Sequence, residues 1–371
     1  MKIYWVTVRQ IGDLCSTTTV ALAEGLVLEG HSVTVLGPKS PLNTSSTKWK
    51  HIELEQSSIR GLKAISLARA AVQWFKEHSP SDVDAVILDW QIASRVAPLL
   101  LSFGWPMILM DRSPPADVSF LARIQWREWK KSWKLVENQT ILRGCVVSNL
   151  HSKLIQDRFA IQSSSIHVLP AGVDLQLFNK VDENKLSDGW RLVYHGRLDK
   201  HRGVLSLPML VQKLNSNGVA SKLTLIGEGD AYQALKTMEQ KFNWMEVHPR
   251  MEHAKVAKIL SLQHIGLLPM PESKVWKIAS PLKRSEYLAS GLLILGIKHA
   301  GHQVSNNEME WMKLFPQQEF HKKSIEWLTQ FRFKELSSLS NRARLFAEEH
   351  YSWDGSVAEL DLAIQGLISE S

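Results

Sequence analysis

A helix start near residue 281 could hold an anion. Ser280 is a suitable N-cap, and Pro281 suits the first helical position because its missing N–H would have no partner there. The backbone amides of Leu282 and Lys283 would then point out of the helix at the positive end of its dipole, where a phosphate is the natural ligand. Glu286, one turn further on, is placed to accept hydrogen bonds from sugar hydroxyls. The alternative interpretation is an ordinary capped helix that precedes a strand.

The elements that would position this helix alternate between strand and helix along the chain, which predicts an α/β architecture with parallel sheets and crossover helices. The expected strands lie near residues 3–8, 32–36, 85–88, 107–110, 145–147, 167–169, 192–194, 223–226, 246–248, 265–268 and 292–295. A polar stretch at 179–189 separates two sets of strands and is expected to be the domain linker. Because open α/β sheets bind ligands outside the carboxyl ends of their strands, two facing sheets would place the site in the cleft between domains.

Length and composition agree with a globular protein of two domains. The chain has 371 residues, which is too long for one ordinary core. Its two cysteines, Cys15 and Cys145, show no spacing typical of a metal site or a disulfide framework, so a reducing cytoplasm fits best. The N-terminus reads as a strand rather than a secretory signal. The longest apolar stretch, 96–110, is interrupted by proline and glycine and is shorter than a membrane span requires.

Short motifs along the chain resemble those of one enzyme family. The segment around Glu286 is similar to the donor-site signature of the family-4 retaining glycosyltransferases, also called glycosyl transferases group 1. The other motifs that resemble the family occur in its order at 1–37, 170–178, 194–203, 226–229 and 351–353. Each short motif is weak alone, but together and in order they are specific, and the resemblance covers essentially the whole chain.

The resemblance implies the GT-B fold, in which two Rossmann-like parallel-sheet domains face each other across a cleft and a C-terminal helix crosses back to the N-terminal domain. The implied boundaries are 1–175 for an acceptor domain, 176–350 for a nucleotide-sugar donor domain and 351–371 for the closing helix. The implied activity is a hexosyltransferase-type transfer from a UDP- or GDP-linked sugar to a glycan or lipid-linked acceptor, as in the synthesis of cell-surface glycans. Transfer would retain the anomeric configuration and need no metal cofactor.

The loop that resembles the family's diphosphate-binding loop places Gly196, Arg197 and Arg202 at the mouth of a strand. A nucleotide sugar carries negative charge next to the bond that breaks, and two cations could stabilise the leaving diphosphate without a metal. Arg202 stands where the family usually has lysine, so it keeps the charge but offers a planar fork. By resemblance, Glu286 would hold the ribose of the donor. The alternative for both cations is that they are solvated residues of a surface loop.

Other positions extend or depart from the family pattern. Ile278 stands where family members commonly have a glutamate that contacts the transferred sugar, which loosens any inference about the donor sugar. Asp111 follows a strand where many relatives carry a histidine, and it could orient substrate hydroxyls or cap the following turn. Gly12 corresponds to a glycine-rich loop that lets the backbone approach the diphosphate. The backbone near Arg250 and Met251 is expected to contact the nucleotide base.

The predicted helix at 121–136 carries two stripes. One stripe consists of Trp126, Trp129, Trp133 and Val136, and the other, about 100° away, consists of Arg123, Arg127, Lys130 and Lys134. Tryptophans flanked by cations suit an anionic membrane interface, and the net charge of +7 agrees with this. We therefore expect peripheral attachment to the inner face of the cell membrane. The alternative is a core-facing aromatic stripe with a solvated basic shoulder, and no nucleic-acid motif accompanies the basic charge.

Two other classes of function are compatible with the same motifs. An NDP-sugar epimerase of GT-B fold would need acid and base carboxylates in the cleft and would interconvert sugar nucleotides without an acceptor. A noncatalytic nucleotide-sugar binder is suggested by Ile278 and would bind the donor tightly without turnover.

Overall fold

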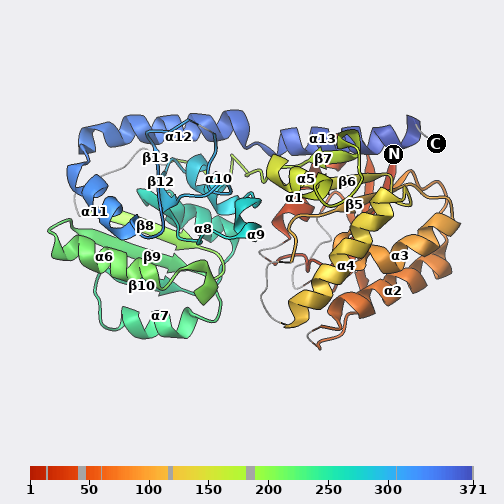
Figure 1. The fold of residues 1–371 in the computed structure, drawn as a ribbon, viewed down its shortest axis with the longest axis horizontal. Coiled ribbons are helices and arrows are strands. Elements are labelled where there is room, and N and C mark those ends of the chain that lie inside the picture. Colours follow the sequence, from red (N-terminus) through yellow and green to blue (C-terminus); the bar gives the residue numbers. More distant parts are fainter. Residues whose placement is uncertain are drawn as a thin grey trace. The chain divides into compact units, whose positions relative to one another are not determined.

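The computed structural model of the chain describes residues 1–13, 16–40, 47–59, 61–115, 120–180, 189–305 and 307–369. Its helices and strands form two compact units, whose elements are labelled in Figure 1. Unit 1 comprises Met1–Pro170 and Trp353–Ser371, and unit 2 comprises Ala171–Ser352. The sequence placed the corresponding boundaries after residues 175 and 350.

Unit 1 is built on a parallel sheet of 7 strands in the order β3-β2-β1-β4-β5-β6-β7. The strands are β1 (Lys2–Val6), β2 (Ser32–Pro38), β3 (Lys50–Leu54), β4 (Ala85–Asp89), β5 (Met107–Met110), β6 (Arg143–Val146) and β7 (Ile166–Val168). β1 pairs with β2 on one side and with β4 on the other. Successive strands are therefore added toward one edge of the sheet up to β3 and toward the opposite edge from β4 onward. Loops diverge where this direction changes, and a crevice forms at the carboxyl edge of the sheet.

Helices cover both faces of this sheet. They are α1 (Thr17–Leu28), α2 (Lys63–His78), α3 (Trp90–Ser102), α4 (Phe120–Glu137), α5 (Asn149–Gln156) and α13 (Trp353–Ser369), with a 3-10 turn at Ser163–Ser165. Alternate residues of β1 join different cores, since Ile3 and Trp5 pack with α1 and α13 whereas Tyr4 and Val6 pack with α2, α3 and α4. The sheet therefore separates two apolar layers, as in a Rossmann-like domain.

The last helix, α13, belongs to the core of unit 1. Its apolar face, including Leu360 and Ile364, is fully buried against the β1–α1 side of the sheet. Gly25 of α1 lets it approach closely, because a Cβ there would lie 2.2 Å from a methyl group of Val357. His31 adds a polar contact at the rim, with its Nε2 2.8 Å from a carboxylate oxygen of Asp361. The predicted return of the C-terminal helix to the N-terminal domain is confirmed.

Unit 2 is built on a second parallel sheet, with 6 strands in the order β10-β9-β8-β11-β12-β13. The strands are β8 (Trp190–His195), β9 (Ser221–Ile226), β10 (Met245–His248), β11 (Ile265–Leu268), β12 (Leu293–Ile297) and β13 (Met312–Phe315). The helices are α6 (Ser206–Ser216), α7 (Tyr232–Glu239), α8 (His253–Leu260), α9 (Lys274–Lys277), α10 (Leu282–Ala289), α11 (Phe320–Gln330) and α12 (Leu336–His350). Two 3-10 turns, Lys200–Arg202 and Phe333–Glu335, complete the unit.

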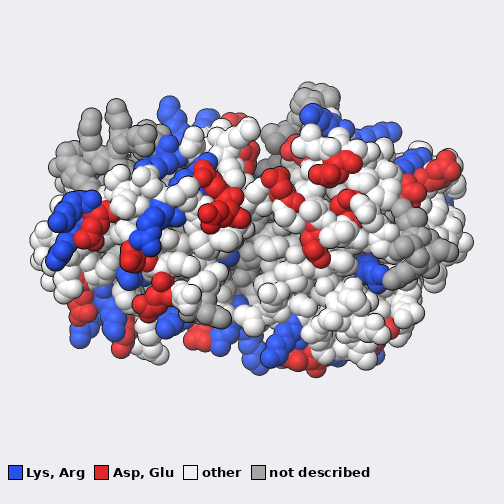
Figure 2. All heavy atoms as spheres, turned by 90° about the horizontal axis from the view of Figure 1, so that it is seen from above, with Lys and Arg blue, Asp and Glu red and all other residues white. Residues whose placement is uncertain are grey.

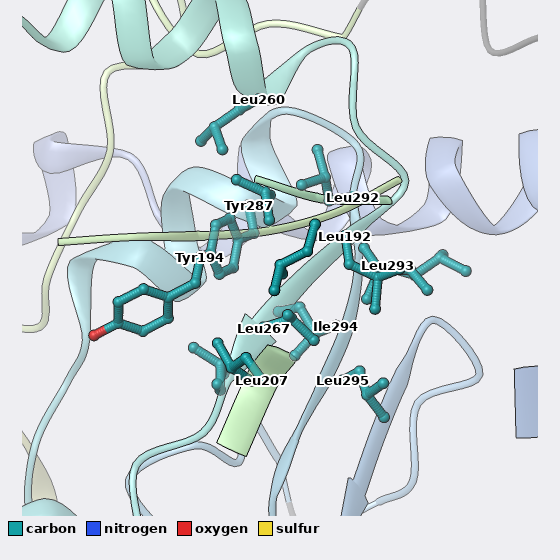
Figure 3. Packing of buried hydrophobic residues seen from close by; sticks show 14 of the residues in the cluster. Leu192, Tyr194, Leu207, Leu260, Leu267, Tyr287, Leu292, Leu293, Ile294 and Leu295 are labelled. Atoms are coloured by element: carbon teal, nitrogen blue, oxygen red, sulfur yellow. The ribbon is translucent and has the colours of Figure 1, made fainter. Parts of the chain in front are cut away.

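One continuous apolar cluster fills unit 2. Leu192, Leu267 and Ile294 come from neighbouring central strands and are fully buried together with side chains from the helices (Figure 3). Tyr194 lies at the border of this cluster, and its phenol oxygen points away from the other labelled side chains (Figure 3). The ring of Tyr287 packs directly over Gly266 of β11, where a Cβ would lie 2.2 Å from the ring. This contact fixes α10 against the sheet.

The α/β class with two Rossmann-like parallel sheets is confirmed, and each strand expected from the sequence is present. The sequence missed β3 and β13, which are edge strands of the two sheets. The expected linker at 179–189 falls within the range of unit 2, and its residues 181–188 lie outside the described residues. Among the described helices, none is long and apolar enough to cross a membrane.

Candidate functional site

The loop after β8 packs against the loop after β9 through glycines. Gly196 has φ +115° and donates its backbone N–H to the carbonyl oxygen of Ile226 at 2.9 Å. Gly227 has φ +146°, and a Cβ there would lie 1.8 Å from the carbonyl oxygen of Gly196. Both positions thus need glycine for conformation and for space. The next loop along this edge, after β10, carries exposed Arg250 and half-buried Met251.

The two cations predicted to bind diphosphate meet at one carboxylate, that of Asp199. The guanidinium of Arg197 lies 3.1 Å and 3.2 Å from the two oxygens of Asp199 and 3.3 Å from Glu228. Nε of Arg202 lies 3.6 Å from Asp199, and its guanidinium stacks on the ring of Trp276 at 4.7 Å. Burial alone would raise the pKa of Asp199, but the hydrogen bond and charge of Arg197 outweigh it and lower that pKa. Asp199 therefore holds both cations at the carboxyl edge of the sheet.

Ser280 is not the N-cap of α10, so that prediction is wrong. Pro281 takes the cap position with extended backbone (φ −76°, ψ 119°) and makes no side-chain cap. The hydroxyl of Ser280 instead accepts the backbone N–H of Ala171 at 3.1 Å, and Ser285 donates to the carbonyl of the same residue at 3.1 Å. The helix begins at Leu282, one residue later than predicted, and its amide and that of Lys283 belong to the first turn, as expected.

Glu286 lies in the first turns of α10, and its side chain is 5% exposed. Its Oε2 is 3.0 Å from Nε2 of His195, the last residue of β8, in an ion-pair contact. Burial opposes ionisation, but the charge of His195 and further help from His253 and Lys283 lower the pKa of Glu286. The backbone N–H of His195 is fixed by the phenol oxygen of Tyr287 at 3.2 Å. The sequence motif includes His195, but sequence reasoning gave it no function.

The side chain of Lys283, as well as its backbone, belongs to this cluster. Its Nζ lies 4.9 Å from the centre of the Tyr194 ring and would lie 3.4 Å from a Cβ placed on Gly196. Burial, followed by repulsion from Arg202, lowers the pKa of Lys283 to about 7, although Glu286 opposes the shift. Sequence reasoning assigned only the backbone amide of Lys283, so this ammonium group is an addition to the site.

Ile278, which replaces the family's first glutamate, is buried at the end of α9 with 7% exposure. An apolar side chain is therefore well accommodated at this position. In the described part of the chain, no group of three or more His, Cys, Asp and Glu side chains could hold a metal ion.

Asp111 lies in the interior of unit 1, not at a surface. Its side chain is 0% exposed, and Oδ2 accepts hydrogen bonds from the indoles of Trp129 at 2.6 Å and Trp133 at 2.9 Å. Nε2 of His151 is 3.2 Å from the same oxygen. The indole N–H groups of Trp129 and Trp133 thus have their acceptor in Asp111, inside the core. Its contact with substrate stays an untested prediction, and it does not cap the following turn.

Gly12 follows β1 and has φ +88°, so this turn needs glycine. Its N–H donates to the hydroxyl of Ser16 at 3.1 Å, just before α1 begins. Its predicted approach to a diphosphate is not tested by these contacts.

The tryptophan stripe of α4 is part of the core, which contradicts its predicted contact with a membrane. Trp129 and Trp133 are 0% exposed, and Trp126 packs against the same cluster, with Arg158 5.4 Å from its ring. The cationic stripe, by contrast, is exposed: Arg123, Arg127, Lys130 and Lys134. On the face seen in Figure 2, basic side chains are interspersed with acidic ones. The described residues of this face therefore form no single positively charged patch.

No family model matches the sequence, and no curated protein matches it. Solved structures resemble it along essentially its whole length. Sucrose-phosphate synthase from Thermosynechococcus elongatus has a TM-score of 0.80 at 16% identity and covers 100% of both chains. WaaG, a glycosyltransferase involved in lipopolysaccharide biosynthesis, has a TM-score of 0.75 at 13% identity and covers 96% of this chain and 99% of its own. Anabaena HepE in complex with UDP-glucose has a TM-score of 0.72 at 11% identity and covers 100% of both chains. The chain therefore has the GT-B fold.

Proposed function

We propose that the chain is a family-4 retaining glycosyltransferase that moves a sugar from a nucleotide-diphosphate donor to an acceptor. The observation that carries this proposal is the cluster at the carboxyl edge of unit 2, where Arg197, Arg202 and Lys283 lie around a glycine-lined loop beside the buried Glu286. Three cationic side chains beside a helix start suit a diphosphate. A buried carboxylate next to them suits a ribose.

Each of these groups has a defined task in the proposed reaction. Arg197 and Arg202, held by Asp199, stabilise the negative charge that grows on the diphosphate as the bond to the sugar lengthens. The amides of the first turn of α10 and the ammonium of Lys283 add to this field. Glu286, ionised by its pairing with His195, accepts hydrogen bonds from the ribose hydroxyls.

The bond that breaks joins the anomeric carbon of the sugar to an oxygen of the diphosphate. The bond that forms joins the same carbon, on the same face, to an acceptor oxygen, whose proton passes to the departing diphosphate. The protein then supplies position and charge stabilisation rather than a pair of carboxylates. We propose that the arginines make a metal unnecessary, so turnover should persist in EDTA.

The donor and acceptor are also part of the proposal. Solved structures of HepE hold UDP or UDP-glucose, which supports a UDP-linked donor ahead of a GDP-linked one. We propose a glycan or lipid-linked acceptor at a cytoplasmic location. Any peripheral attachment to an anionic membrane would depend on the exposed cations of α4 alone.

The test is donor binding followed by product analysis. Calorimetry should show that UDP or a UDP-sugar binds the wild-type protein and binds Glu286→Ala more weakly. NMR of the product should show the anomeric configuration of the donor. Inversion would contradict the proposed mechanism, and failure to bind any nucleoside diphosphate would contradict the proposed function.

The buried Ile278 favours one second candidate, a noncatalytic nucleotide-sugar binder. Tight donor binding without release of nucleoside diphosphate in the presence of any acceptor would support it.

A further inference from the structure

Unit 1 contains a polar pocket of about 30 Å³. Its polar lining residues are Arg9, Thr18, Thr19, Asp89, Gln91 and Arg112. Arg9 follows β1, Asp89 ends β4 and Arg112 follows β5, so the pocket lies at the carboxyl edge of the sheet. It also adjoins the point between β1 and β4 where the strand order reverses. Open α/β sheets bind ligands at this place.

Two arginines give the pocket a positive charge. Arg9 is half-buried, and its backbone N–H donates to the hydroxyl of Thr7 at 3.1 Å. Its guanidinium makes no hydrogen bond or ion pair with any residue that the structure describes. Arg112 donates one N–H to the carbonyl oxygen of Leu169 at 2.6 Å, which leaves further donors on its guanidinium. Burial lowers the pKa of Arg112 to about 10, so this group is still a cation at neutral pH.

One carboxylate faces these cations, but its oxygens are already engaged. Oδ2 of Asp89 accepts the hydroxyl of Thr7 at 2.7 Å and the backbone N–H of Val8 at 3.0 Å. Oδ1 accepts the indole N–H of Trp5 at 3.3 Å. Both carboxylate oxygens of Asp89 therefore already accept hydrogen bonds from β1 and the residues that follow it. Asp89 offsets only part of the positive charge of the two arginines.

Hydroxyl donors complete the lining at the start of α1. Thr18 and Thr19 are 7% and 4% exposed, and neither side chain has a hydrogen-bond partner among the described residues. They stand in the first turn of a helix that carries no acidic residue there. These hydroxyl donors lie beside a positive helix end and therefore suit an anionic ligand.

The size of the pocket restricts how such a ligand can bind. About 30 Å³ holds roughly two water-sized atoms, which excludes a sugar ring. A phosphate or carboxylate could enter with its outer oxygens and leave the rest of the molecule outside. The pocket therefore fits a terminal group and not a whole substrate.

We propose that this pocket binds a terminal phosphate or carboxylate of the sugar acceptor. The proposal rests on the proposed function, because only a transferase has an acceptor. Arg9 and Arg112 would pair with the anion, and Thr18 and Thr19 would donate to its oxygens. The pocket thereby selects acidic acceptors over neutral ones.

Calorimetry at fixed ionic strength tests the pocket without turnover, with inorganic phosphate, glucose 6-phosphate, glucuronate and uncharged glucose as probes. The wild-type protein should bind the three anions and not glucose. Arg9→Gln and the nearly isosteric Thr19→Val should each weaken anion binding by about tenfold or more, as loss of a charge-assisted contact predicts. The matched control Arg69→Gln removes an exposed cation of α2 outside the pocket and should change nothing.

UDP binding distinguishes the acceptor from the donor as the source of the anion. Arg9→Gln and Thr19→Val should leave UDP affinity within twofold of wild type. An equal loss of UDP and glucose 6-phosphate affinity would assign the pocket to the donor diphosphate and overturn the proposal. Absence of anion binding, or equal anion affinities in the wild type and both pocket variants, would also overturn it.

Vesicles containing phosphatidic acid identify whether the acceptor anion is a lipid headgroup. Displacement of glucose 6-phosphate by these vesicles, but not by neutral vesicles, would support a lipid-borne anion, and lack of displacement would support a soluble one. Failure of sugar transfer from every nucleotide sugar would contradict the proposed function but leave the measured anion binding intact. The two failures are thus separable.

Discussion

Each unit buries a carboxylate beside a histidine, and the two pairs differ in what surrounds them. In unit 1, Asp111 lies 3.2 Å from His151 and is closed off by two indole rings. In unit 2, Glu286 lies 3.0 Å from His195 at an edge lined by glycine and cations. The chemical pair is the same, but one is sealed by apolar groups and the other is bordered by groups that attract an anion.

This difference distinguishes a carboxylate that binds donors of its own core from one that we propose binds a ligand. A buried charge is tolerated where protein donors replace water, and Asp111 receives such donors from within its own core. Among the described residues, Glu286 has only His195 as an ion-pair partner, so it keeps capacity for ligand hydroxyls. Residue type and burial alone do not reveal which of the two carboxylates can accept a ligand hydroxyl. The neighbouring residues do.

The largest effect should come from removing the sealed carboxylate. Asp111→Ala leaves two indole N–H groups and His151 without their acceptor and should lower the free energy of unfolding by about 3–5 kcal/mol. Chemical denaturation followed by tryptophan fluorescence measures this, with Asp111→Asn as a control that keeps one acceptor. A variant that is as stable as wild type but inactive would instead show that Asp111 contacts substrate.

Removal of the diphosphate cations should affect turnover rather than folding. Arg197→Ala and Arg202→Ala should each reduce kcat by about 100-fold or more, because charge stabilisation of the leaving group is lost. Steady-state kinetics with a UDP-sugar measures the loss, and the exposed Arg332→Ala is the matched control. Unchanged kinetics in a folded Arg197→Ala protein would refute the assignment.

The open carboxylate should matter for ligand binding. Glu286→Ala should weaken UDP binding by about tenfold, because hydrogen bonds from the ribose hydroxyls to a charged acceptor are lost. Calorimetry measures the affinity, and uridine alone is a useful control because it keeps the ribose but lacks the diphosphate. Equal UDP affinity in the variant would mean that Glu286 does not face the nucleotide.

The ammonium of Lys283 should make nucleotide binding depend on pH. Its pKa is about 7 in the free protein, and a bound diphosphate favours the charged form and raises that pKa. Affinity for UDP should therefore be highest below pH 7 and fall by up to about tenfold per unit as pH rises above 7. Calorimetry from pH 6 to 9 checks this, and Lys283→Met should flatten the profile. An unchanged profile in that variant would place the titration elsewhere.

The smallest effect concerns the exposed cations of α4. If they alone attract an anionic membrane, Arg127→Ala should weaken binding to phosphatidylglycerol vesicles by about fivefold, corresponding to roughly 1 kcal/mol. Sedimentation at low and high salt measures the binding, which should weaken with salt. Lack of vesicle binding by the wild-type protein at low salt would end the membrane proposal.

The sequence predicted the fold better than the surroundings of individual side chains. Periodicity identified the central strands, but β3 and β13 are both largely half-buried or exposed rather than buried, so neither gave a clear signal. Motif order located Gly196, Arg197, Arg202 and Glu286. Motifs do not specify tertiary partners, however, so the pairing of Glu286 with His195 was not predicted.

Two errors have identifiable physical causes. Serine is a residue type favoured at N-caps, but the hydroxyl of Ser280 accepts a hydrogen bond from the backbone of Ala171 instead. Pro281 occupies the cap position. The stripe of Trp129 and Trp133 has the periodicity of a membrane face, but it equally fits a core face. Buried indoles need acceptors, and an aspartate at the end of a neighbouring strand could have indicated the core.

The placement of α13 has a consequence for how the protein is made. Unit 2 is one continuous segment, so all of its core is available once residue 352 has emerged from the ribosome. The core of unit 1 includes Leu360, Ile364 and Leu367, which are synthesised after the whole of unit 2. The half of the chain made first must therefore wait for residues beyond 352 to close its apolar face, and domains generally fold as units. During that interval, the exposed surface of unit 1 is a natural substrate for chaperones.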